Sequence, residues 1–218
     1  MQGLSFVQQL VVWAPPVLLA VTLHEVAHGW MALKLGDTTA FAQGRLSLNP
    51  LRHVDPVGTV LVPAILLLAG GFIFGWAKPV PVDYSRLRDP RRDMAIVAVA
   101  GPAANLVMAL GWAALLKVAA AGHELLPAAI VVPLSYMGLA GVMVNIILAV
   151  LNMIPVPPLD GGRVATGLLP IGPARVLARL EPIGLIVLLV LLVSGVLGQL
   201  LGPPVNFLQQ LILSMVVS

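Results

Sequence analysis

The sequence predicts an all-α membrane protein, a polytopic helical bundle that forms one integral-membrane domain over residues 1–218, with small β-strand insertions after the first span. Hydrophobic residues make up 59% of the 218 residues and charged residues only 10%, which leaves too little polar surface for a soluble globule of this size. Four apolar stretches are each near the ~20 residues that cross a hydrocarbon core of ~30 Å. These predicted spans are Pro16–Leu35, Met94–Lys117, Val132–Ile154 and Ile183–Leu201.

The net charge of +3 does not call for a nucleic-acid partner. The basic residues are spread over the loops between the spans and form no stripe or run, and the preference of cytoplasmic loops for Lys and Arg explains them. The chain contains no cysteine, which excludes a disulfide framework and a thiol nucleophile.

The first span begins after a pair of prolines. Because proline suits the first turn of a helix and not its interior, the main helix is expected to start at Pro16, with Gly3–Trp13 as a kinked extension or an interfacial helix. The N-terminus lacks the cationic region of a signal peptide, so this segment is expected to be retained. A glycine, Gly36, marks the expected end of the span.

Two stretches between the first and second spans read as extended. Gly44–Pro50 alternates polar and apolar residues, and Phe72–Val82 is rich in glycine and proline, so both are expected to form strands that pair or lie against protein. Between them, Val57–Gly70 is too short for a span and is flanked by basic residues on both sides. Residues 57–82 are therefore expected to form a re-entrant segment, and a segment that spans the membrane is the alternative.

The C-terminal stretch, Val205–Ser218, follows two prolines and is also shorter than a span. It is expected to be a short helix that lies in the interface or packs against the core, with a membrane-spanning helix as the alternative.

The chemistry is concentrated in the motif His24-Glu25-x-x-His28, which lies in the middle of the first span. On a helix, residues four apart share a face, so both imidazoles can bind one metal ion, and Glu25 lies close enough to polarise water. Ionisable groups at this depth are costly, at ~2.5–3.5 kcal/mol for a charge, which favours a functional site over polar residues that merely face a helical bundle.

A hydrolytic zinc site usually has three protein ligands, and Asp160 is the candidate for the third. It follows the third span in the stretch Asn152–Arg163, where three prolines break the helix and two glycines permit a tight backbone. An unwound segment there can aim a carboxylate inward. The alternative is a helix-ending turn in which the aspartate is only a cap.

These residues resemble the site-2 protease family of intramembrane zinc metalloproteases. The resemblance rests on His24-Glu25-x-x-His28 followed by Asn152-x-x-Pro155 and Leu159-Asp160-Gly161, with support from Gly101-Pro102-Ala103-Ala104-Asn105 and Gly44–Pro50. It implies one zinc ion held by His24, His28 and Asp160, with Glu25 as the catalytic acid and base and Asn152 near the substrate or the oxyanion.

The resemblance also implies a single metalloprotease domain in a prokaryotic cell membrane, of a compact branch without PDZ or cystathionine-β-synthase domains. The expected partners are the lipid bilayer and a protein substrate that is cleaved within or near a transmembrane segment. An unpaired edge of the predicted strands is a candidate for holding that substrate in extended form. The alternative function is a zinc-binding transporter or a non-proteolytic membrane scaffold.

Four other polar residues are weaker candidates for a functional role. Asn105 is expected to bond to a neighbouring helix or the backbone, with the orientation of a metal ligand as the alternative, and Asn145 is expected to be a packing contact. His53 and His123 lie in predicted loops and are expected to be ordinary surface histidines.

Overall fold

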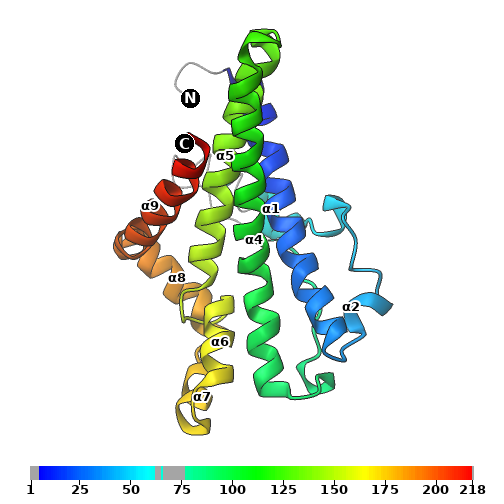
Figure 1. Cartoon of the computed structure of the whole chain (residues 1–218). Helices are drawn as coiled ribbons and strands as arrows, with labels where there is room; N and C mark the ends of the chain where they lie inside the picture. The colour runs from blue at the N-terminus through cyan, green and yellow to red at the C-terminus, as the bar shows by residue number, and fades with distance from the viewer. Residues whose placement is uncertain (1–4, 62–64, 66–76, 218) are drawn as a thin grey trace.

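Three long helices, α1, α4 and α5, lie side by side and form the centre of the molecule in the computed structural model (Figure 1). The structure describes residues 5–61, 65 and 77–217. Its α-helices are α1 (Phe6–Lys34), α2 (Thr39–Ala42), α4 (Pro90–Ala121), α5 (Ala128–Asn152), α6 (Asp160–Leu168), α7 (Ile171–Ala178), α8 (Gly184–Val193) and α9 (Val196–Val217). Short helical turns are η1 (Pro50–Arg52), η2 (Pro56–Leu61), η3 (Tyr84–Arg86), η4 (Gly122–Glu124) and η5 (Glu181–Ile183).

Within the described residues, four helical stretches are long and apolar enough to cross a membrane. They are Val7–Lys34, Pro90–Glu124, Ala128–Asn152 and Ile171–Val193. The chain passes along α1, returns along α4 and runs along α5 in the same direction as α1 (Figure 1). As expected from the order of the spans, the end of α5 therefore reaches the same side of the bundle as the end of α1.

The first helix starts earlier than the sequence predicts. Ser5 caps the helix. Its hydroxyl accepts a hydrogen bond from the backbone N–H of Gln8 at 3.3 Å, while the side-chain oxygen of Gln8 accepts from the backbone N–H of Ser5 at 2.8 Å. The helix then continues through Pro15 and Pro16, so the segment before them is an extension of α1. It ends as predicted, since Gly36 adopts a φ of +115° that favours glycine.

The predicted β-strand insertions are wrong: the described residues contain no strand. Residues 45–49 form an irregular loop, and so do residues 77–82, which lie beside them. Side-chain bonds join the two loops, since Arg45 Nη2 donates to the carbonyl oxygens of Lys78 at 2.9 Å and Pro79 at 3.2 Å. A ladder is not available here, because Pro79 and Pro81 have no N–H to donate.

Most of the predicted re-entrant segment lies outside the described residues, and so do Phe72–Trp76 of the second predicted strand. The start of the segment forms η2. The idea that a strand edge holds the substrate loses its basis, because the described parts of both predicted strands are irregular.

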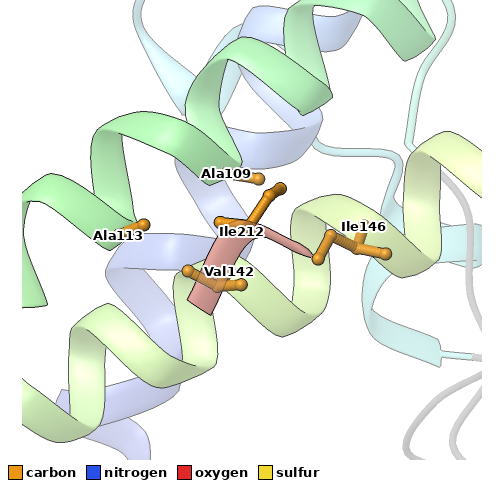
Figure 2. Close-up of a cluster of buried hydrophobic side chains, with 5 residues drawn as sticks. All are labelled: Ala109, Ala113, Val142, Ile146 and Ile212. Carbon is orange, nitrogen blue, oxygen red and sulfur yellow. The ribbon is translucent and has the colours of Figure 1, made fainter. Parts of the chain in front are cut away.

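The last predicted span is divided into two helices. The helix is interrupted at Ser194 and Gly195, where Gly195 has a φ of +77°. Helix α9 then begins at Val196 and continues through Pro203 and Pro204. The predicted short C-terminal helix is thus the second part of α9, and it packs against the core. Figure 2 shows Ile212 of α9 beside Ala109 and Ala113 of α4 and Val142 and Ile146 of α5.

Small residues let α4 and α5 approach each other closely. A Cβ added to Gly141 would lie 2.2 Å from Cγ of Trp112, so this indole occupies the space that the glycine leaves. A Cβ added to Gly138 would lie 3.0 Å from the Cβ of Leu116. The close contact fixes α4 against α5 and positions the polar residues between them.

Candidate metal centre

The two motif histidines point from α1 toward α4. His24 and His28 lie one helical turn apart, their Nε2 atoms are 3.0 Å apart, and their exposed fractions are 7% and 8%. Gly101 of α4 lies directly against both rings. The local reason is the helix itself, which places residues four apart on one face.

The structure brings Asp160 to this histidine pair. Its Oδ2 atom lies 3.2 Å from Nε2 of His24 and 3.2 Å from Nε2 of His28, and the residue is 5% exposed. Asp160 is the first residue of α6, which starts after the proline-rich turn that follows α5. His24, His28 and Asp160 are called the metal centre below.

Glycines allow the start of α6 to pack onto that turn. A Cβ on Gly161 would lie 2.3 Å from the carbonyl oxygen of Met153, and a Cβ on Gly162 would lie 2.4 Å from the nitrogen of Pro157. Side chains at either position would push α6 away from the turn and carry Asp160 away from α1. The Pro and Gly residues that suggested an unwound segment therefore aim the carboxylate.

The hydrogen bonds around the centre fit a bound cation. His28 Nδ1 lies 2.7 Å from the carbonyl oxygen of Val97, and His24 Nδ1 lies 2.6 Å from Oδ1 of Asn105. Both partners are acceptors, so each Nδ1 carries the proton and each Nε2 presents a lone pair. The two lone pairs and the carboxylate oxygen then face one another, an arrangement that is unfavourable without a positive charge between them.

The donor set and its spacing suit zinc. The three donor atoms form a triangle with edges of 3.0, 3.2 and 3.2 Å. Two nitrogens and one oxygen around a tetrahedral zinc ion, at ~2.0–2.2 Å each, lie ~3.3 Å apart. The Oδ2 atom of Asp160 is buried and has no hydrogen-bond partner in the part of the chain that the structure describes, as expected of an atom that binds a metal. Three protein ligands leave a fourth position for water or substrate.

Glu25 is held by the loop that precedes η3. Its Oε2 accepts a 2.7 Å hydrogen bond from the backbone N–H of Val80. Val80 is buried, and its side chain lies in the space left by Gly29, where an added Cβ would come within 2.7 Å of Cγ1 of Val80. The irregular loop at residues 77–82 thus fixes one oxygen of the carboxylate beside the histidine pair.

Asn152 lies at the last turn of α5, where the structure shows it half-buried. Its Nδ2 donates to the carbonyl oxygen of Leu148 at 3.0 Å. A side-chain amide has two N–H groups, so this bond leaves one for another acceptor. The structure does not bring Asn152 into contact with the metal centre through any hydrogen bond among the described residues.

The expectation of a surface position for His53 is wrong. The residue is 2% exposed, its Nε2 lies 2.8 Å from the carbonyl oxygen of Ser47, and its own carbonyl oxygen accepts from the Lys78 amide at 2.9 Å. His53 therefore helps to fasten the loop that carries Val80. The bond to Ser47 spans only six residues, but the bond to Lys78 joins segments 25 residues apart, and the local sequence gives no signal for that contact.

Tyr84 and Arg163 lie together on the side of the centre where α6 begins. The Arg163 guanidinium carbon is 5.7 Å from the centroid of the Tyr84 ring. Burial raises the pKa of the Tyr84 phenol, and the charge of Arg163 only partly opposes that rise. The phenol is therefore neutral at physiological pH and keeps its proton as a donor.

Known proteins that are similar to this chain carry the names of zinc metalloproteases. A family model described as peptidase family M50 matches residues 123–195, a range that includes Asn152 and Asp160. The protein named "Putative zinc metalloprotease YwhC" of Bacillus subtilis is 40% identical over 191 residues, which cover 87% of this chain and 84% of the relative. "Putative zinc metalloprotease Rip2" of Mycolicibacterium smegmatis is 30% identical over 198 residues, which cover 90% and 72%. No solved structure matches the chain.

Proposed function

The chain belongs to peptidase family M50, the site-2 proteases, and we propose that His24, His28 and Asp160 hold its zinc ion while Glu25 moves the proton. It is an integral membrane protein and an intramembrane zinc metalloprotease. The relatives do not favour the alternative of a transporter or scaffold. The observation that carries the assignment of ligands is the convergence of two imidazole lone pairs and one buried carboxylate oxygen within 3.2 Å.

The reaction is peptide-bond hydrolysis. A zinc ion held by His24, His28 and Asp160 would supply Lewis acidity, which would polarise a peptide carbonyl and lower the pKa of water toward ~7. Glu25 accepts the proton from the attacking water and then gives it to the nitrogen of the leaving amine. Because the Val80 amide occupies one oxygen of the Glu25 carboxylate, we assign the proton transfer to the other oxygen.

Asn152 is the candidate for the oxyanion donor. We infer that the amide N–H not bonded to Leu148 donates to the oxygen of the scissile carbonyl as negative charge develops on it. Such a donor is worth ~2.7–4 kcal/mol in the transition state. The place of Asn152 at the end of α5, eight residues before Asp160 in the chain, supports this role.

The substrate class follows from the position of the histidine pair on a helix that is apolar enough to cross a membrane. The family acts on peptides or membrane proteins, and we propose that this chain cleaves within or near transmembrane segments, using residues 1–218 as one membrane domain. The histidine pair lies on a helix that is apolar enough to cross a membrane, which supports a substrate that arrives within the bilayer. A substrate helix must unwind locally to expose its carbonyl, since helical carbonyls are hydrogen-bonded.

The test is cleavage of a synthetic transmembrane peptide by the purified protein in lipid nanodiscs, with products identified by mass spectrometry. We expect cleavage that stops on zinc chelation, returns on zinc addition, and falls by ~10²–10⁴ in the Glu25→Gln variant. The variant should bind zinc as the wild type does, because Glu25 is not one of the assigned ligands. Cleavage at the wild-type rate by Glu25→Gln would refute the mechanism.

A further inference from the structure

Two asparagines lie in the centre of the bundle, behind the metal centre. Asn105 of α4 and Asn145 of α5 are both 0% exposed. Asn105 Nδ2 donates to Asn145 Oδ1 at 2.9 Å and to the carbonyl oxygen of Ala20 at 3.2 Å, and its Oδ1 faces His24. Asn145 Nδ2 in turn donates to the carbonyl oxygen of Gly141 at 2.9 Å. Gly141, Asn145, Asn105 and His24 thus form a continuous chain across α5, α4 and α1, and Ala20 is a side branch at Asn105.

The direction of this chain is fixed by its backbone partners. A carbonyl oxygen can only accept, so Gly141 requires the NH₂ group of Asn145 to face it, which turns the Asn145 oxygen toward Asn105. That oxygen and the Ala20 carbonyl both require donors, so the NH₂ group of Asn105 faces them. The remaining oxygen of Asn105 must then face His24 as an acceptor.

We propose that Asn145 and Asn105 are a positioning relay that holds the proton of His24 on Nδ1 and so presents the Nε2 lone pair to the metal. Among the described residues, no hydrogen bond joins Asn145 to the metal centre or to Glu25, so Asn145 acts through Asn105. The proposal rests on the function assigned above, because it concerns the same zinc ligand.

The two histidines have different kinds of hydrogen-bond partner at Nδ1, and this difference explains why Asn145 is needed beside Asn105. His28 donates to a backbone carbonyl, that of Val97, which cannot turn around. His24 donates to a side-chain amide, which could present either its oxygen or its NH₂ group if nothing fixed it. With the NH₂ group toward His24, the proton of the ring would move to Nε2 and remove the lone pair that binds zinc. Asn145, together with the Ala20 carbonyl, prevents that rotation.

The experiment is a double-mutant cycle read as zinc affinity, measured by competition with a chromogenic chelator on the full-length protein in detergent. Asn105→Leu removes the acceptor and is expected to weaken zinc binding by ~10–100-fold. Asn145→Leu leaves Asn105 in place with the Ala20 carbonyl but without the closer of its two orienting partners, and it is expected to weaken binding roughly tenfold. The double variant should bind zinc no more weakly than Asn105→Leu alone, because Asn145 acts only through Asn105.

Two further variants separate positioning from packing. In Asn145→Asp a neutral carboxyl can donate to Gly141 and accept from Asn105, so zinc affinity should stay within about threefold of the wild type. Val142→Ala removes buried volume from the same face of α5 without touching the chain of amides, and it should leave zinc affinity unchanged. If the leucine variants do not fold, the aspartate variant and the matched Asn145→Ala variant carry the comparison.

Unchanged zinc affinity in Asn145→Leu, or losses that multiply in the double variant, would overturn the relay. Equal weakening by Asn145→Asp and Asn145→Leu would also overturn it, since only the relay gives the carboxyl an advantage. A wild-type protein that binds zinc but leaves peptides uncut would contradict the proposed function alone, because the cycle is read from zinc affinity and not from cleavage.

Discussion

Gly101→Ala should disable the metal centre by adding one methyl group. The added Cβ would lie 2.3 Å from Nε2 and 2.6 Å from Cε1 of His28, and 2.7 Å from Cε1 of His24. Ordinary carbon contacts are ~3.5 Å, so a ring or α4 must move by roughly 1 Å. Zinc ligands tolerate displacements of about ±0.2 Å. We therefore expect zinc affinity to fall at least tenfold, about 1.4 kcal/mol, and peptide cleavage to fall with it.

The matched control is Gly111→Ala on the same helix. A Cβ added there meets no atom of the described residues within 4 Å, so zinc binding should be unchanged, while the better helix propensity of alanine should stabilise α4 by up to ~1 kcal/mol. The assay is chelator competition for zinc, together with thermal unfolding of both variants in detergent. Wild-type zinc affinity in folded Gly101→Ala would refute the placement of α4 against the histidines.

Three other substitutions test separate parts of the site. Asp160→Asn should lower zinc affinity by more than the ~10–100-fold that outer-shell losses cost, and retained zinc in the dialysed variant would contradict its role as a ligand. Gly29→Ala would bring a Cβ to 2.7 Å from Cγ1 of Val80 and disturb the amide that holds Glu25. We expect a roughly tenfold loss of kcat with zinc content preserved, whereas loss of zinc would place the damage elsewhere. Asn152→Ala should lower kcat by ~10²–10³ with little change in KM, and an unaltered kcat would remove it from the catalytic step.

The sequence predicts those features of the site that arise from local geometry. His24 and His28 are one turn apart on any helix, and their position in an apolar span indicates a functional site in which both bind one metal ion. Asp160 can be anticipated because prolines and glycines around it break the helix just after a span. Asn105 also gives a signal, since it is a polar residue one helical turn from Gly101 in an apolar span.

The features that the sequence does not predict depend on contacts between distant segments. Alternation in residues 45–49 suggests a strand, but a strand needs a partner, and the neighbouring segment has prolines at positions 79 and 81. The bond from Val80 to Glu25 joins residues that are 55 apart, and the bond from the Lys78 amide to the His53 carbonyl joins residues that are 25 apart. The break between α8 and α9 depends on Gly195, whose φ of +77° cannot be read from an apolar run.

X-ray absorption at the zinc edge on the purified protein tests the central claim most directly. We expect one zinc ion per chain, bound by nitrogen and oxygen donors at ~2.0–2.2 Å with two imidazoles, and a loss of that spectrum in Asp160→Asn. A wild-type protein that takes up no zinc, or a spectrum that is unchanged when Asp160 is replaced, would contradict the metal centre built from His24, His28 and Asp160.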